Sequence, residues 1–339
     1  MDSLTHKPQR PPTPTSSRFF IRSLQTMTAN MPMTKHKTDP TMPLEFQQIT
    51  LHDQERYLAL LGCCPQKTSD LSFANIFGWA EEYGLEWCFD ENLVWLRQQN
   101  PEPQLWAPVG PWNDVDWAAL WPCLANASFH RVPEELTEIW RKTFGERMIP
   151  SEARGQWDYV YSVSELIELK GNRFHKKKNL LRQFQRNYRA AYHPLDMDCV
   201  ERVLEMQSNW CTWKECVDSD ALEAENTAIE RVLKEWDRIP GLMGGALEVE
   251  GEIVAYTVAE ALTSDTVVIH FEKGDTRFKG IYQAINNLFL ADAATGFENV
   301  NREQDLDDEG LRKAKLSYNP IRFLKKYGVR FVDAEQSST

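Results

Sequence analysis

The chain of 339 residues carries a formal charge of −12 and is 42% hydrophobic and 11% aromatic, which allows two domains of typical size with packed cores. No run of about eighteen apolar residues occurs, so the sequence predicts no membrane-spanning helix. The seven cysteines form no C-x-x-C pair and no Cys/His pattern typical of a metal site. This usage predicts no bound metal and favours a reducing, cytoplasmic compartment.

Residues 1–43 differ from the rest of the chain. They are rich in Pro, Thr, Ser and Met, contain six Lys/Arg but two acids, and show no periodicity. This composition predicts a disordered N-terminal tail. Two alternatives stay open: an organelle transit peptide, because the segment is basic and poor in acids, or a segment upstream of a native start at an internal methionine such as Met42.

Residues 44–170 contain the elements of a first α/β unit. Helical spacing of apolar residues defines its helices, and short β-forming runs bounded by turns define its strands. Asp70 is the predicted N-cap of a helix that runs through residues 73–80. The predicted order is strand 46–50, helix 53–61, helix 73–80, strands 85–89, 93–96 and 105–109, helix 114–124, strand 128–132, helix 133–143 and strand 157–162.

Residues 168–194 join this unit to a second one. Apolar residues recur there three and four positions apart, which predicts a basic linking helix over residues 171–194 with one apolar stripe. That stripe consists of Leu180, Leu181, Phe184 and Tyr188.

The same stretch carries eight Lys/Arg and no acid between residues 168 and 196, in an otherwise acidic chain. Cations this close repel one another unless an anion neutralises them, so we expect an anion-binding face. A phosphate backbone is the usual partner of such a patch, and a plain solvated surface helix is the alternative. The candidate contacts are Arg173, Lys176, Lys177, Lys178, Arg182, Arg186 and Arg189.

Residues 195–335 repeat the element order of the first unit: two helices, three strands, then helix, strand, helix, strand. The clearest hairpin has its turn at Glu250-Gly251. Two copies of a mixed α/β unit are therefore the predicted architecture. The predicted elements are helices 197–213 and 221–238, strands 246–250, 252–260 and 266–272, helix 281–294, strand 299–302, helix 309–317 and strand 328–332.

Three stretches carry a resemblance to a known family: YSVSELIELKGNRFHKKKNLLRQFQRNY (161–188), HFEKGDTRFKGIYQAINNLF (270–289) and VNREQDLDDEGLRKAKLSYNP (300–320). They resemble the C-terminal domain of phosphatidylglycerol lysyltransferases, related to the Fem-type aminoacyltransferases, and in particular its uncharacterised stand-alone bacterial members. The resemblance covers roughly residues 44–332. It implies two tandem GNAT-like acyltransferase domains joined by the basic helix.

The resemblance also implies an activity. In such enzymes an aminoacyl group moves from aminoacyl-tRNA to a lipid, peptide or small-molecule acceptor, and the basic helix holds the tRNA. The full lysyltransferases carry an N-terminal membrane region, which this sequence lacks, so a phosphatidylglycerol acceptor is in doubt. The family's substrate-binding residues do not align one by one, and no catalytic role is transferred from it.

The loop after strand 266–272 is a candidate phosphate site. Its glycines allow a ligand close to the backbone, its cations bring charge, and a helix N-terminus follows. The spacing G-x5-G departs from the GNAT pattern, so a plain surface turn is the alternative. The candidate residues are Lys273, Gly274, Arg277, Lys279 and Gly280.

Glu272 and His270 are the candidate general bases. Glu272 ends the predicted central strand, and His270 lies two residues earlier, which places both on one strand face. Removal of the acceptor's proton is one requirement of acyl transfer. The alternatives are a hydrogen-bonded core histidine and an ion pair between Glu272 and Lys273.

Residues 300–320 form the second dense group. Glu303 and Asp305 are candidates for catalysis or for binding an amino group, and Tyr318 is a further catalytic candidate. The alternative is a salt-bridged helix start, with acids facing the positive helix terminus. Candidate contacts to phosphate or carboxylate are Arg302, Arg312, Lys313 and Lys315.

The sequence lacks G-x-S-x-G, H-E-x-x-H and G-x-x-x-x-G-K-[ST] motifs, so it gives no support to a hydrolase, a zincin or a nucleotide triphosphatase. The predicted function is an acyltransferase of the aminoacyl type with no bound cofactor and with aminoacyl-tRNA as co-substrate. Alternatives are an acyl-CoA-dependent N-acyltransferase and a non-catalytic RNA- or anion-binding module. tRNA is the expected partner, and an anionic membrane surface is a second one that the basic helix would fit.

Overall fold

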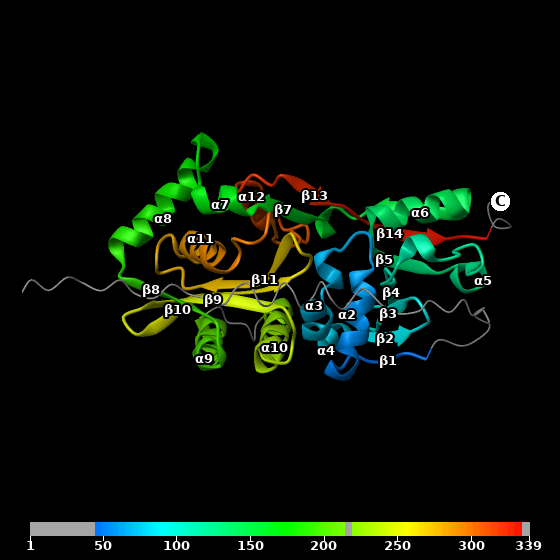
Figure 1. The fold of residues 1–339 in the computed structure, drawn as a ribbon, viewed down its shortest axis with the longest axis horizontal. Coiled ribbons are helices and arrows are strands. Elements are labelled where there is room, and N and C mark those ends of the chain that lie inside the picture. The colour runs from blue at the N-terminus through cyan, green and yellow to red at the C-terminus, as the bar shows by residue number, and fades with distance from the viewer. Residues whose placement is uncertain (1–44, 214–218, 334–339) are drawn as a thin grey trace, which may run out of the picture. The chain divides into compact units, whose positions relative to one another are not determined.

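Two seven-stranded mixed sheets form the framework of the protein (Figure 1). The computed structural model describes residues 45–213 and 219–333, so the predicted N-terminal tail lies outside the described residues. Within the described part, no helix has the length and apolar character needed to cross a bilayer.

The first sheet contains strands from the N-terminal half and one from the C-terminus. Most predicted elements of this half are present, often shorter than expected. The elements are β1 (Gln47–Gln48), α2 (Gln54–Gly62), α3 (Phe73–Gly78), α4 (Ala80–Tyr83), β2 (Glu86–Phe89), β3 (Val94–Gln98), β4 (Gln104–Trp106), α5 (Trp121–Leu124), β5 (Ser128–Pro133), α6 (Glu134–Phe144) and β6 (Met148–Glu152).

The second sheet and its helices follow. The elements are β7 (Asp158–Ser162), α7 (Val163–Glu168), α8 (His175–Asn187), β8 (Ala190–Pro194), α9 (Met197–Trp213), α10 (Asp220–Lys234), β9 (Leu242–Val249), β10 (Glu252–Ala261), β11 (Thr266–Gly274), α11 (Ile281–Ala293), β12 (Asn299–Asn301), α12 (Glu309–Leu316), β13 (Arg322–Leu324) and β14 (Lys326–Phe331).

The two sheets share one pairing pattern. Their strand orders are β1-β2-β3-β4-β5-β14-β6 and β8-β9-β10-β11-β12-β7-β13. Each has a single parallel pair, β4 with β5 and β11 with β12, and antiparallel pairs elsewhere. Each also takes its sixth strand from the other half of the sequence, namely β14 and β7. The predicted domain boundary at residues 171–194 therefore does not coincide with the division of strands between the sheets.

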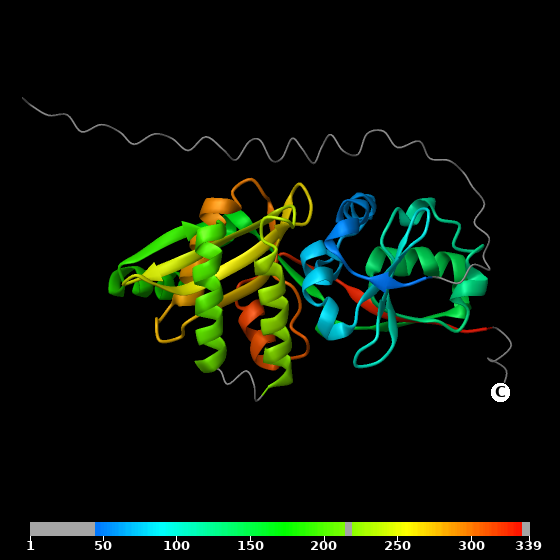
Figure 2. The same cartoon turned by 90° about the horizontal axis from the view of Figure 1, so that it is seen from below.

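Helices cover both faces of the second sheet. α11, α7 and α8 lie on one face, and α9 and α10 run side by side across the other (Figure 2). Two clusters of buried apolar side chains result. One lies under α11 and includes Phe184 of α8, whereas the other continues from α9 and α10 into the first sheet through the contact of α10 with α3. Apolar burial on this scale is the main source of stability.

The predicted basic helix is shorter than expected. α8 ends at Asn187, because Tyr188 is already extended, and residues 190–194 form the edge strand β8 instead of a last helical turn. The apolar stripe is confirmed in its central part, since Leu181 and Phe184 are buried. The short strands β6 and β13 are further elements that the sequence pattern did not predict.

Two local predictions in the first half are wrong. Ser72, and not Asp70, is the N-cap of α3: its hydroxyl accepts a hydrogen bond from the Asn75 backbone N–H. Asp70 is buried among cations instead. The helix predicted over residues 114–124 is reduced to α5 and a preceding 3-10 turn, Trp112–Asp114.

Candidate functional site

The candidate site lies where strands β11 and β12 separate. Their parallel ladder consists of three residue pairs and ends at Val268 and Asn301. Beyond these residues the strands carry the polar side chains that the sequence singles out, among them Glu272 and Arg302. Two polar clusters result, one on each face of the sheet.

A β-bulge at His270 determines which side chains reach which face. Val258 pairs with Phe271, but the next residue, Ala259, pairs with Ile269, so His270 is the extra residue of β11. A bulge of this kind breaks the simple alternation of side chains. The expectation that His270 and Glu272 share a strand face is therefore wrong.

Glu272 belongs to the cluster on the α11 face, which we call the Tyr318 cluster: Lys177, Glu272, Arg302, Lys315 and Tyr318. A Glu272 carboxylate oxygen lies 2.8 Å from Arg302 Nη2, and the other oxygen accepts a hydrogen bond from Asn286 at 3.1 Å. The Arg302 guanidinium carbon lies 4.8 Å from the centroid of the Tyr318 ring. These contacts bring together three residues that the sequence proposed for the site.

Two lysines complete the Tyr318 cluster. Lys177 of α8 turns inward, and its ammonium lies 3.7 Å from the centroid of the Tyr318 ring. Lys315 of α12 donates to the Arg302 carbonyl oxygen. Burial, together with the Arg302 charge, lowers the pKa of Lys177 and the pKa of Lys315 to about 8 each. The cluster therefore has an excess of cations over its one carboxylate.

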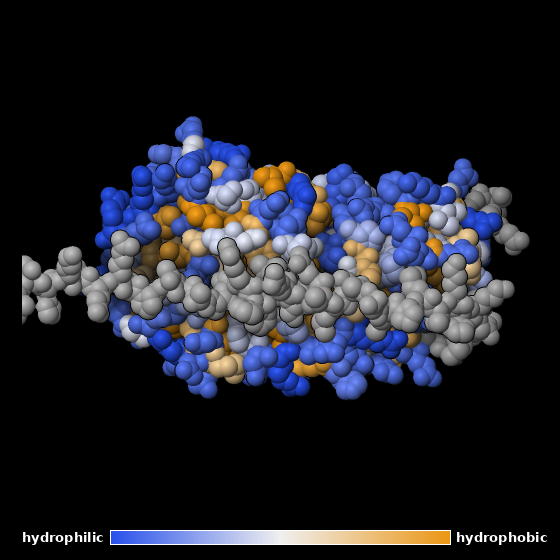
Figure 3. Space-filling model, in the orientation of Figure 1, coloured by the Kyte–Doolittle hydropathy of each residue, from blue (hydrophilic) through white to orange (hydrophobic). Residues whose placement is uncertain are grey.

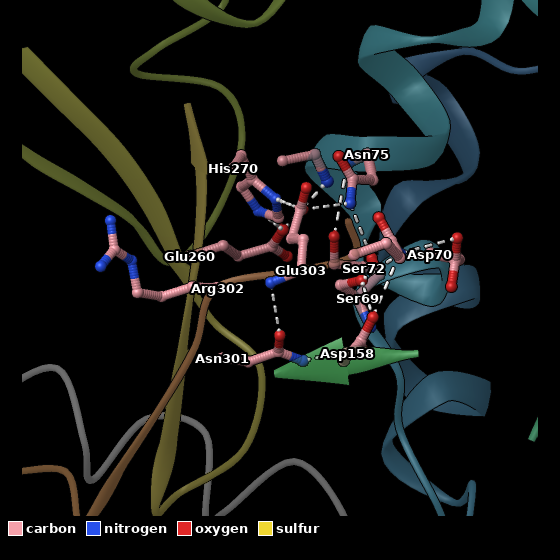
Figure 4. A network of polar contacts seen from close by, with 12 residues as sticks. Ser69, Asp70, Ser72, Asn75, Asp158, Glu260, His270, Asn301, Arg302 and Glu303 are labelled. Atoms are coloured by element: carbon pink, nitrogen blue, oxygen red, sulfur yellow. Dashed lines mark hydrogen bonds and ion pairs between the residues drawn. The ribbon is translucent and has the colours of Figure 1, made fainter. Parts of the chain in front are cut away.

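His270 belongs to the cluster on the opposite face, beside α3 (Figure 4). Its Nδ1 lies 2.9 Å from a Glu303 oxygen and its Nε2 lies 3.2 Å from a Glu260 oxygen. Burial alone would lower the pKa of His270, but the hydrogen bonds with Glu260 and Glu303 outweigh it and raise the pKa to about 9. The imidazole is therefore protonated at neutral pH.

Helix α3 closes this second cluster from the N-terminal half. The Ala74 backbone N–H donates to Glu260 at 3.0 Å, and the Asn75 amide donates to Glu303 at 2.7 Å. Glu303 has a positive φ of 57°. In Figure 4 the Arg302 side chain points away from Glu303, toward the other face of the sheet.

A buried ion network lies next to these residues. Lys326 of β14 pairs with Asp70 and lies 2.7 Å from an Asp158 oxygen. Asp70 also pairs with Arg131, and Asp158 accepts a hydrogen bond from Asn301 at 2.8 Å. The two carboxylates are held by cations and donors from both sheets, so this network ties the halves together.

The residues proposed for a phosphate loop after β11 do not converge. Lys273 points to the α9–α10 face, where it pairs with Glu225 at 2.6 Å and lies over the Trp210 ring. Asp275, buried at the loop, binds the Arg277 guanidinium and backbone N–H. Lys279 N–H is 3.4 Å from the Tyr188 hydroxyl.

Gly274 and Gly280 meet neighbouring elements at this loop. Gly274 packs against Ile281, the first residue of α11, and Gly280 packs against the backbone of Leu180 in α8. The backbone contact and a φ of 90° require glycine at position 280, whereas a Cβ at position 274 would only crowd the Ile281 side chain at 3.1 Å.

Asp305 and Arg312 form a separate structural pair. The fully buried Asp305 carboxylate accepts hydrogen bonds from Arg312 at 2.8 Å, Tyr159 at 2.5 Å and Arg154 at 3.1 Å. Burial would raise the pKa of Asp305, but these hydrogen bonds, that of Arg312 first, hold the pKa below its ordinary value. The neighbouring Lys313 is exposed.

The outer face of α8 is exposed and basic. Figure 3 shows strongly hydrophilic residues over the region that α8 occupies in Figure 1. Arg173 pairs with Glu165. In the described part of the chain, no carboxylate contacts Lys178 or the exposed cations of this face, which we call the outer row. The outer row consists of Lys176, Arg182 and Arg186 of α8 and of Arg189, which follows the helix.

Several members of the two clusters escaped the sequence analysis. Gln283 of α11 donates to the Tyr318 hydroxyl at 3.0 Å, and the Tyr161 hydroxyl donates to the Lys315 carbonyl at 2.9 Å. Glu260 and Asn75 contact site residues that are distant in sequence. Helical spacing of Gln283 and Asn286 on one face of α11 is the one signal that the sequence offered.

Comparison with known proteins gives the family. A family model described as "Phosphatidylglycerol lysyltransferase, C-terminal" matches residues 63–330. A conserved protein of unknown function from Bacteroides thetaiotaomicron is 30% identical, with a TM-score of 0.79, over 85% of this chain and 100% of that chain. An uncharacterised protein of Mycoplasmoides gallisepticum is 23% identical over 176 residues, which are 52% of this chain and 56% of that protein.

More distant structures share the fold. L-PGS from Bacillus licheniformis has a TM-score of 0.51 at 14% identity, over 75% of this chain and 90% of that chain. FemX has a TM-score of 0.54 at 9% identity, over 84% of this chain and 97% of that chain. The predicted mixed α/β architecture with two tandem GNAT-like units is confirmed. With a family model that spans residues 63–330, the chain belongs to the family of phosphatidylglycerol lysyltransferase C-terminal domains.

Proposed function

We propose that the protein transfers an aminoacyl group from aminoacyl-tRNA to an acceptor with an amine or hydroxyl group. One observation carries the proposal: the exposed cations of α8 lack carboxylate partners in the described residues and lie on the helix that also supplies Lys177 to the Tyr318 cluster. A nucleic-acid backbone is the anion that such a row fits. The aminoacyltransferase type of the fold and family supports the donor.

The transfer is an exchange of one bond for another. The acceptor's nitrogen or oxygen forms a bond to the ester carbonyl carbon of aminoacyl-tRNA, the bond from that carbon to the ribose oxygen breaks, and the acceptor's proton ends on the ribose hydroxyl. Such a reaction needs a proton acceptor, a stabilised carbonyl oxygen and aligned substrates.

Residues of the Tyr318 cluster supply these functions in our proposal. Glu272 is the proton acceptor, since it is the carboxylate of that cluster. Arg302 stabilises the negative charge on the carbonyl oxygen, and its ion pair with Glu272 at 2.8 Å aligns both groups. His270 is less suited to the role of base, because it is protonated at neutral pH and lies on the other face of the sheet.

Acyl-CoA is the alternative donor, and the loop before α11 argues against it. The Asp275 carboxylate of that loop binds the Arg277 guanidinium, a cation that the phosphates would need as a partner. A phosphate at the helix start would also meet α8, since the Cβ of any residue in place of Gly280 would lie 2.3 Å from the Leu180 carbonyl oxygen. The region where a helix N-terminus could hold phosphates is therefore occupied by the protein itself.

The test is a single-turnover assay with the full chain and tRNA charged with labelled amino acids. We expect loss of label from tRNA with gain in an amine- or lipid-containing extract, and a decrease of at least about a hundredfold in Glu272→Gln. Glu309→Gln, at an exposed position of α12, is the matched control and keeps the wild-type rate. RNA binding without transfer to any acceptor would indicate a non-catalytic module. An increase in melting temperature with CoA alone would indicate that acyl-CoA is the donor.

A further inference from the structure

Lys177 differs from the other cations of α8. Its ammonium lies 3.7 Å from the Tyr318 ring centroid, and the side chain is partly buried where α8 meets the Tyr318 cluster. Among the described residues, no carboxylate and no hydrogen-bond acceptor contacts this ammonium. The ammonium is therefore available to an anion that enters the cluster.

A second cation lies on the same aromatic ring. The Arg302 guanidinium carbon is 4.8 Å from the Tyr318 centroid, and its carboxylate partner is Glu272. One carboxylate thus balances Arg302 and leaves the Lys177 charge without compensation. Burial and the Arg302 charge lower the pKa of Lys177 to about 8, and an anion bound there would remove this destabilisation of the ammonium.

We propose that Lys177, beside the Tyr318 ring, binds one phosphate of the single-stranded 3′ end of a bound RNA. The inference rests on the proposed function and adds to it the place where the RNA enters the site. The exposed row on α8 would hold the double-stranded part, and Lys177, on the same helix but turned inward, would hold the strand that carries the ester.

The basic residues continue along α8 from its outer face to the Tyr318 cluster, which favours RNA over other phosphate-containing ligands. Lys176 is exposed and Lys177 faces the cluster, so neighbouring residues connect the outer basic face with the inside. An aromatic ring beside cations is also a common way to hold single-stranded nucleic acid. An anionic lipid surface would also attract the outer row, and the test below therefore includes lipid vesicles.

The test compares two RNA hairpins by fluorescence anisotropy: one with a single-stranded 3′ overhang and one with a blunt end. We expect Lys177→Gln to weaken binding of the overhang hairpin about tenfold, to lower its salt slope by about 0.7, and to leave the blunt hairpin unchanged. Lys177→Arg keeps wild-type affinity. Lys176→Gln, the exposed neighbour, weakens both hairpins equally.

Three results would overturn the subsite. Equal weakening of both hairpins by Lys177→Gln would make Lys177 an ordinary member of the outer row. Unchanged RNA affinity with weaker binding to phosphatidylglycerol vesicles would assign the site to a lipid phosphate. Failure of the wild-type chain to bind either hairpin would remove the proposed function together with the subsite, whereas the first two results would leave that function standing.

Discussion

Gly280 lies against the backbone of Leu180: a Cβ at position 280 would be 2.3 Å from the Leu180 carbonyl oxygen. Gly280 also has a φ of 90°, in the region that favours glycine. The contact joins the start of α11 to the middle of α8. It therefore limits how closely α8 and α11 can approach each other.

Substitution of this glycine tests that contact. Gly280→Ala should lower the free energy of unfolding by about 3 kcal/mol, through the strained φ and the collision with a backbone that cannot rotate away. Gly251→Ala is the matched control, because Gly251 has the same φ of 90° but open space at its Cβ. It should cost about 1 kcal/mol. Equal losses in urea unfolding would contradict the packing argument.

The pKa of His270 predicts a pH dependence of stability. The pKa is raised to about 9 in the folded protein from an ordinary value of 6.5, so the ion pairs with Glu260 and Glu303 stabilise fully below pH 6.5. This contribution to the free energy of unfolding decreases as the pH rises above 6.5 and is lost once the pH passes about 9. Its upper limit is on the order of 3 kcal/mol.

Urea unfolding of the wild type and His270→Gln at several pH values measures this effect. The wild type should lose stability between pH 6.5 and 9, and the curve of the variant should be flatter over the same interval. His52→Gln is the control, because the His52 side chain is exposed. Parallel curves for the wild type and His270→Gln would show that the imidazole is not the titrating group.

Local signals in the sequence predicted much of the fold. Apolar spacing around Phe184 predicted the centre of α8, and the turn at Glu250-Gly251 predicted the hairpin of β9 and β10. Edge strands such as β8 were missed because a few residues with half-exposed side chains carry no clear periodicity. The sequence could not predict that β7 joins the second sheet and β14 the first, because strand pairing between distant segments leaves no local pattern.

The site was predictable only in part, for the same reason. Glu272, Arg302 and Tyr318 were found because they lie in dense polar stretches, and the structure brings them together. The face of His270 was mispredicted, because a bulge shifts the alternation of side chains and leaves no sequence signal. Contacts such as that of Lys326 with Asp70 join residues from opposite ends of the chain.

The buried ion network predicts that Lys326 is essential for stability. Lys326→Met removes the cation between Asp70 and Asp158 and leaves buried carboxylates with fewer partners. We expect a loss of about 3–5 kcal/mol in the free energy of unfolding. Lys325→Met, next in sequence but with a half-exposed ion pair to Glu134, should cost less than about 1 kcal/mol.

A double variant separates charge from shape at this position. Asp70→Asn combined with Lys326→Met removes a negative charge along with the positive one, and it should recover part of the loss caused by Lys326→Met alone. If the double variant were less stable than the sum of the two single variants predicts, the network would not act through paired charges.

Reversal of charge on the outer face of α8 tests the observation on which the proposed function rests. Arg182 and Arg186 are exposed, so Arg182→Glu with Arg186→Glu should leave the melting temperature unchanged and lower tRNA affinity by at least about a hundredfold. Lys142→Glu with Arg330→Glu makes the same change of net charge at exposed positions on α6 and β14. Because nonspecific attraction depends on total charge whereas a binding face depends on its place, the second pair should reduce affinity far less. Equal losses in both double variants, measured at several salt concentrations, would show that overall charge, and not the face of α8, governs tRNA binding.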